Sequence, residues 1–145
     1  MAAELTRDAH APGWGPGFAR FTSWPYRLEW IVATLLLAGA LFGWRMTVHK
    51  DLDLAATAAW IVLPDLVFLP IAFGMRGGRR WPRWGSLAYN ATHSFVVFAL
   101  VFGAVSLAAW HVAWPMLGWA LHLSADRALG FWLRAGPRDQ LAGEF

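Results

Sequence analysis

The chain contains no cysteine and few charged residues, and both absences narrow the classes of protein to which it can belong. Without cysteine it cannot form disulfides, thiolate metal sites, covalent haem links or lipoprotein anchors. Histidine, carboxylate and amide side chains remain as candidate ligands. Charged residues make up only 14% of the 145 residues, whereas hydrophobic residues make up 58%. With a mean hydropathy of +0.42, the chain is too apolar for an ordinary soluble domain and is predicted to be an integral membrane protein.

Long uncharged segments predict the membrane-spanning helices. Residues 84–125 contain no Asp, Glu, Lys or Arg, and this run is long enough for two helices because about 20 residues cross a bilayer. A third span covers residues 54–75, where Pro64 and Asp65 are expected to interrupt the helix, and a fourth covers residues 26–44. The turn near residues 110–115 is short enough to make the last two helices antiparallel neighbours. We therefore predict an all-α integral membrane four-helix bundle over residues 25–134.

The distribution of basic residues predicts the orientation of these spans. Residues 1–24 lack the design of a cleaved signal and are expected to form a flexible lead-in, and residues 135–145 a short tail. Arg45 and Lys50 fall on one side of the predicted spans. The other side carries Arg7, Arg20, Arg27, Arg76, Arg79, Arg80, Arg83, Arg134 and Arg138. The positive-inside rule then places the lead-in, the tail and both termini in the cytoplasm, for a multi-pass protein of the inner membrane.

The same patterns indicate the partners. Because the basic residues serve as topology signals, we expect contact with the lipid bilayer and no binding of nucleic acid. Gly39 and Gly43 have the GxxxG spacing that permits close approach of two helices in a membrane. Helices of other membrane proteins, or a second copy in a dimer, are therefore the candidate protein partners.

Ionisable side chains within the predicted spans mark the candidate site, because such groups are costly in a bilayer and normally face partners. These are Asp65, His93, His122 and Asp126. At a rise of about 1.5 Å per residue, all four fall in the cytoplasmic half of the membrane. Antiparallel packing of the last two helices brings His93 level with His122 and Asp126, which are four residues apart and share a helix face.

Further polar residues extend this group into a predicted pocket that opens toward the cytoplasm. Tyr89 and Asn90 share a helix face with His93, and Glu29 enters the same half of the membrane from the first helix. The predicted pocket comprises Glu29, Asp65, Tyr89, Asn90, His93, His122, Asp126 and Arg127.

Several chemistries fit this residue set. His93, His122, Asp65 and Asp126 are suitable ligands for a divalent metal ion, and such an ion could activate water, with Glu29 as the candidate general base. Either histidine could instead be an axial ligand of haem or a chlorin. The acids and histidines could also relay protons or ions, or form a hydrogen-bonded layer that fixes helix register. A binding or accessory subunit is the favoured function, with a metal-dependent membrane hydrolase and a proton or ion relay as alternatives. Whether the protein is an enzyme stays open.

At these residues the chain resembles a family of small bacterial membrane proteins, domain-of-unknown-function family 4260, over roughly residues 26 to 134. The resemblance implies a four-helix membrane fold without an assigned activity. The matching motifs are Arg27-Leu28-Glu29, Pro64-Asp65 followed by Gly74, Tyr89-Asn90-Ala91-Thr92-His93-Ser94 and Trp119-Ala120-Leu121-His122-Leu123-Ser124-Ala125-Asp126-Arg127-Ala128-Leu129-Gly130-Phe131. The functional positions it implies are Glu29, Asp65, Asn90, His93, His122, Asp126 and Arg127.

Overall fold

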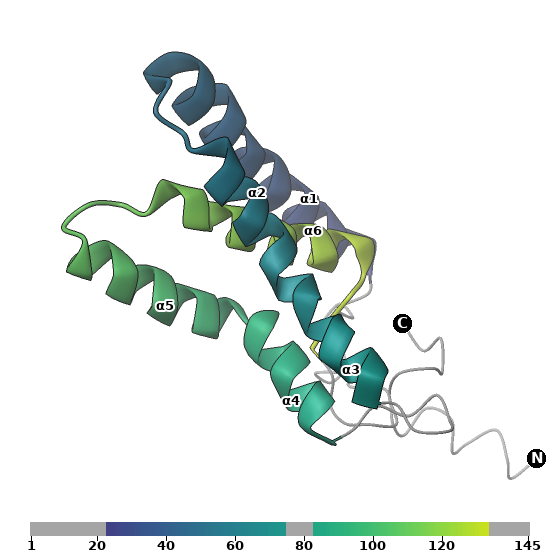
Figure 1. Cartoon of the computed structure of the whole chain (residues 1–145). Helices are drawn as coiled ribbons and strands as arrows, with labels where there is room; N and C mark the ends of the chain where they lie inside the picture. Colours follow the sequence, from purple (N-terminus) through teal and green to yellow (C-terminus); the bar gives the residue numbers. More distant parts are fainter. Residues whose placement is uncertain (1–22, 75–82, 134–145) are drawn as a thin grey trace, which may run out of the picture.

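The computed structural model describes residues 23–74 and 83–133, and within these two ranges the chain forms helices and no strand (Figure 1). The first helix consists of α1 (Trp24–Ala38), which continues as the π-helical segment η2 (Gly39–His49). Pro25 stands in its first turn, where a missing backbone N–H costs no helical hydrogen bond. The helix ends at Lys50, whose φ of 57° is left-handed and cannot continue the helix.

The second helix runs through three segments, α2 (Leu54–Val62), η3 (Leu63–Val67) and α3 (Phe68–Gly74). Asp53 starts it by accepting a hydrogen bond of 2.9 Å from the backbone N–H of Ala56. Within it, η3 is a 3-10 segment that contains Pro64 and Asp65. The predicted interruption is therefore present, as a local change of helical pitch that Pro64 favours by removing one backbone donor.

The remaining helices are α4 (Arg83–Thr92), α5 (Phe95–Ala108) and α6 (Leu117–Leu129), the last preceded by the short segment η4 (Trp114–Met116). A break between α4 and α5 bends the chain by 56°. The predicted turn before the last helix is confirmed, since α5 ends at Ala108 and η4 begins at Trp114.

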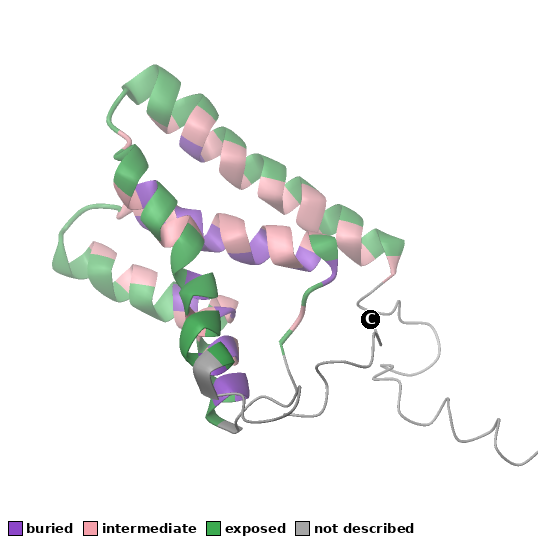
Figure 2. Ribbon diagram, turned by 45° about the vertical axis from the view of Figure 1, so that its right-hand side comes forward, coloured by how far each residue is buried: buried purple, intermediate pink, exposed green. Residues whose placement is uncertain are grey.

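The short helix α6 is the centre of the fold. It packs against α1 and α2 and also contacts α5 and η3 (Figure 1). Gly118 allows the close approach to α2, because a Cβ atom there would lie 2.6 Å from the backbone oxygen of Thr57. On another face, Ser124 is fully buried and its hydroxyl lies 3.0 Å from that of Thr34 on α1. Figure 2 shows buried residues along most of α6 and exposed residues along the outer helices.

An aromatic and aliphatic core surrounds α6. The buried members are Phe98, Trp119, Ala120 and Leu123. The ring of Trp119 stacks on Trp60 of α2 at 5.8 Å and meets Phe98 of α5 edge-on at 5.6 Å. Aromatic side chains of α2 and α5 thus hold α6 in place.

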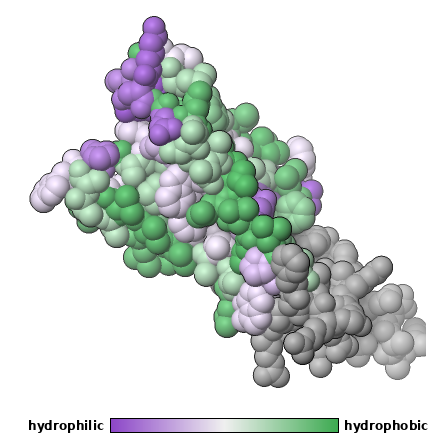
Figure 3. All heavy atoms as spheres, in the orientation of Figure 1, coloured by the Kyte–Doolittle hydropathy of each residue, from purple (hydrophilic) through white to green (hydrophobic). Residues whose placement is uncertain are grey.

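The outer surface is that of a membrane protein in contact with lipid. Large apolar side chains such as Leu36, Leu69 and Leu100 are exposed on three different helices. Figure 3 shows hydrophobic residues over the sides of the molecule and hydrophilic residues at the connection between the first and second helices. Such an extensive apolar surface is expected where lipid replaces water.

The predicted four-helix bundle is not confirmed. Two helices in the described ranges are long and apolar enough to cross a membrane, Trp24–His49 and Leu54–Ala72, and the bent pair α4 and α5 would add a third if it forms one span. With 13 residues, or about 20 Å, α6 is shorter than the roughly 30 Å of a bilayer's apolar core. Residues 1–22 of the predicted lead-in, the connection at 75–82 and the tail at 135–145 lie outside the described residues.

Candidate metal centre

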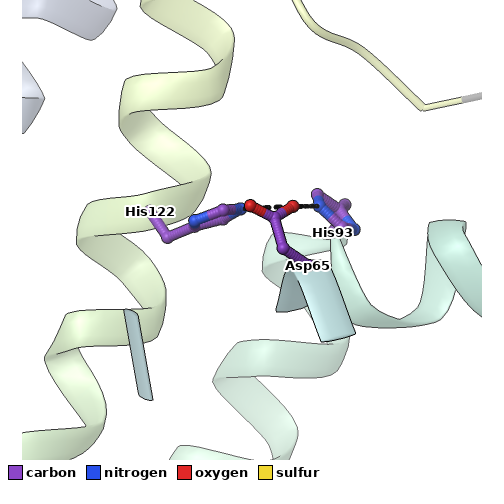
Figure 4. A group of neighbouring side chains, drawn as sticks. All are labelled: Asp65, His93 and His122. Carbon is purple, nitrogen blue, oxygen red and sulfur yellow. Dashed lines mark ion pairs between the residues drawn. The ribbon is translucent and has the colours of Figure 1, made fainter. Parts of the chain in front are cut away.

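Two histidines and two aspartates from three parts of the fold converge beside α6. Asp65 comes from η3, His93 from the break between α4 and α5, and His122 and Asp126 from successive turns of α6. The Nε2 atom of His93 lies 3.5 Å from Oδ1 of Asp65 and 3.6 Å from Oδ2 of Asp126. The Nε2 atom of His122 lies 3.6 and 3.5 Å from the same two oxygens. Figure 4 shows Asp65 between the two histidine rings.

These four separations are compatible with ligands that share a cation or with histidines that share a proton with the carboxylates. They are long for hydrogen bonds, and both Nε2 atoms are buried without a hydrogen-bond partner. Ligand atoms of Asp65, His93 and His122 all lie within 4.8 Å of one another, and Oδ2 of Asp126 lies 3.5–3.6 Å from both histidine nitrogens. Zinc binds histidine nitrogen at about 2.0–2.1 Å and carboxylate oxygen at about 2.0–2.2 Å. Small inward movements of these side chains would therefore complete a zinc coordination shell.

The His93 ring is held in the orientation that a ligand needs. Its Nδ1 atom lies 3.0 Å from the backbone oxygen of Tyr89 and 2.9 Å from the hydroxyl of Thr92. The ring also stacks on Tyr89, with 3.9 Å between centroids and 16° between planes. Donation from Nδ1–H to the Tyr89 carbonyl leaves the Nε2 lone pair directed at the two carboxylates.

The electrostatics of the cluster require positive charge at its centre. A lone pair facing two carboxylates in an apolar environment is repulsive unless a cation or a proton lies between them. The four side chains differ in their exposure to solvent. The Asp65 side chain is 54% exposed, whereas those of Asp126, His122 and His93 are 17%, 11% and 1% exposed. The centre is thus enclosed by protein on the side of α6 and accessible at Asp65.

The break that carries His93 is held by two side chains of α6. The indole Nε1–H of Trp119 donates a hydrogen bond of 2.6 Å to the carbonyl of Thr92. The guanidinium of Arg127 donates one of 2.8 Å to the carbonyl of His93 and another to the carbonyl of Phe131. Interrupted helices persist in membranes where neighbouring side chains satisfy the freed backbone groups. Trp119 and Arg127 meet that requirement here.

Residues 27–138 match the protein family described as Domain of unknown function (DUF4260). The chain belongs to this family. The resemblance predicted from the sequence motifs is thereby confirmed, and all four residues of the cluster lie within the matched region. Neither the curated proteins nor the solved structures contain a match to the chain.

The other residues of the predicted pocket have different positions in this DUF4260 protein. Tyr89 is buried against His93, and Asn90 is half-buried on α4. Arg127 is buried and contacts the backbone at the break. Glu29 is exposed on α1, and within the described residues no hydrogen bond or ion pair joins it to the four-residue cluster. A polar pocket that opens toward the cytoplasm, with Glu29 as a general base, stays a prediction.

Sequence reasoning missed the role of Trp119. A signal was available, because Trp119, Leu123 and Arg127 succeed one another at a spacing of four residues and so lie along one side of a helix. Two long side chains that carry N–H donors on one side of a helix indicate that hydrogen-bond acceptors lie on the element packed against that side. Their acceptors could not be identified, since the break at His93 contains neither proline nor glycine to announce it.

Proposed function

We propose that this protein is an integral membrane metal-binding protein that holds one divalent ion, with zinc the best fit, through His93, His122, Asp65 and Asp126. The observation that carries this proposal is the set of four nitrogen to oxygen separations of 3.5–3.6 Å around a common centre. Two imidazoles and two carboxylates form a mixed ligand set that suits zinc and similar divalent ions. We place the protein in the inner membrane with both termini in the cytoplasm, as its basic residues predict.

Haem and chlorins are poorer fits to the same residues. An axial histidine pair needs a wide planar space between its two Nε2 atoms. Here Oδ1 of Asp65 and Oδ2 of Asp126 each lie 3.5–3.6 Å from both Nε2 atoms. Two carboxylate oxygens thus occupy the space that a macrocycle would need, which favours a bare ion over a pigment.

A metal-dependent hydrolase is the second candidate, and the exposure of Asp65 favours it. A catalytic zinc site commonly has three protein ligands and one position for water. His93, His122 and Asp126 would form the enclosed three, and Asp65, which is 54% exposed, is the ligand that a water molecule could most readily replace. Metal-bound water would then be the nucleophile, because the ion lowers its pKa toward neutrality.

Metal titration of the purified full-length protein tests the proposal. After chelation and dialysis in detergent, the wild-type protein should bind one equivalent of Zn²⁺, and one equivalent of Co²⁺ should give the visible absorption of a four-coordinate site. His93→Ala and His122→Ala should each weaken binding by more than the roughly 10–100-fold effect of second-shell changes. His111→Ala is the matched control, because His111 is exposed in the turn after α5 and its ring contacts the carbonyl of Ala109.

The outcomes separate the candidates. Stoichiometric metal that depends on His93 and His122 but not on His111 supports the proposal. Absence of stoichiometric metal, or equal losses in all three alanine variants, would contradict it. The same four groups would then be examined as proton carriers, the alternative that an acid and histidines within a membrane leave open.

A further inference from the structure

Besides carrying two of the proposed ligands, α6 has a second role at the proposed metal centre. This inference rests on the proposed metal-binding function. We propose that Trp119 and Arg127 are positioning residues that fix the His93 ring by holding the carbonyls of Thr92 and His93, which precede and follow its backbone. Neither side chain would touch the ion. Each acts through the backbone of the ligand-bearing segment.

The hydrogen bonds around His93 support this role. The backbone N–H of His93 donates to the carbonyl of Tyr89 at 2.9 Å, and the ring Nδ1 lies 3.0 Å from the same oxygen. The α4 helix therefore fixes the segment from its N-terminal side. The carbonyls of Thr92 and His93 lie at the break, where the chain leaves the helical path, and they accept hydrogen bonds from Trp119 and Arg127.

The consequence is that α6 controls three of the four ligands. It carries His122 and Asp126 directly, and its Trp119 and Arg127 set the position of His93. Burial strengthens both contacts, because Trp119 is 5% and Arg127 4% exposed. In a dry environment a carbonyl that loses its donor has no water to replace it, so the break would shift to find another partner.

Trp119 also has a packing role, and a matched pair of variants separates the two. Trp119→Phe removes the indole N–H while keeping an aromatic ring against Phe98 and Trp60. Trp60→Phe makes the same change on the other side of the same stack, and Trp60 is only half-buried. Arg127→Lys keeps the positive charge, but a single ammonium lacks the planar fork that joins the carbonyls of His93 and Phe131.

The test uses Co²⁺ as the probe of purified full-length protein in detergent. We expect Trp119→Phe and Arg127→Lys each to weaken Co²⁺ binding by about 10-fold and to shift its visible bands, as other losses of orienting hydrogen bonds do. Trp60→Phe should leave both the affinity and the bands unchanged. Affinities of Trp119→Phe and Trp60→Phe within twofold of each other, with the same bands, would overturn the positioning role.

A second readout keeps the inference testable if the wild-type protein binds no cobalt, a result that would refute the proposed function alone. The ¹⁵N chemical shifts of the histidine rings report their tautomers in the metal-free protein. The positioning role predicts that Trp119→Phe changes the His93 signals and that Trp60→Phe does not. Identical His93 signals in both variants would overturn it.

Discussion

Replacing Gly118 with alanine should separate α6 from α2 and so disturb the metal centre from a distance. A Cβ atom at Gly118 would lie 2.6 Å from the backbone oxygen of Thr57 and 3.1 Å from a side-chain carbon of Ile61. The first contact is with backbone, which cannot rotate away as a side chain could. The two helices must therefore move apart, by roughly 0.7 Å if an ordinary carbon to oxygen contact is to be restored.

Two opposing terms decide the size of the effect on stability. Forcing an extra carbon into a well-packed contact costs about 1–3 kcal/mol. Alanine in place of glycine within a helix returns up to about 1 kcal/mol. The net loss is then about 0–2 kcal/mol, too wide a range to interpret alone. Gly103→Ala supplies the control, because Gly103 lies within α5 and a Cβ atom there meets nothing within 4 Å.

Thermal unfolding in detergent, followed by circular dichroism, measures the difference between the two variants. Because both gain similar helix propensity, Gly118→Ala should be less stable than Gly103→Ala by about 1–3 kcal/mol. His122 lies one turn beyond Gly118 on α6, so the same movement should draw it away from Asp65 and weaken Zn²⁺ binding in Gly118→Ala only. Equal stability and equal zinc affinity in the two variants would refute the close approach of α6 to α2.

Three further predictions concern the cluster, the packing of α6 and the topology. In a double-mutant cycle, Asp126→Asn and His93→Ala should be coupled by 1 kcal/mol or more in Zn²⁺ binding, whereas additivity within about 0.5 kcal/mol would contradict a shared site. Ser124→Ala should lower the free energy of unfolding by about 1 kcal/mol through loss of the contact with Thr34, and Thr34→Val should add little to it, as unfolding of the double variant would reveal. Reporter fusions at residue 1 and residue 145 should both indicate the cytoplasm, and a periplasmic signal from either would overturn the predicted orientation.

The composition of the cluster could be predicted because few ionisable residues lie in so apolar a chain. Asp65, His93, His122 and Asp126 are ionisable residues in the predicted spans, and a costly group in lipid needs a partner. Their similar depth could be predicted as well, because the helical rise converts the number of residues between each group and the end of its span into a distance. Glu29 was assigned to the predicted pocket because of its depth, and depth does not fix the direction in which a side chain points. In the structure Glu29 is exposed on α1.

The path of the chain through the last two predicted spans could not be derived in the same way. The uncharged run from residue 84 to residue 125 is long enough for two helices and predicts two membrane spans. The chain instead breaks at His93 and bends by 56°, and α6, the last helix in the described residues, is too short to cross a bilayer. The groups that stabilise the break, on Trp119 and Arg127, lie far along the chain and belong to another helix. The spacing of Trp119 and Arg127 puts both donors on one side of a helix, but it does not identify the carbonyls that accept from them.

The length of α6 and its polarity have one physical explanation. A helix that faces lipid must be apolar outside and about 30 Å long, whereas a helix enclosed by others is released from both constraints. Enclosure requires close neighbours, which Gly118 permits at α2 and Ser124 at α1. It also allows His122 and Asp126 to stand at membrane depth, because they face η3 and the α4–α5 break rather than lipid. The features that make α6 a poor transmembrane helix are therefore those that the proposed metal centre needs.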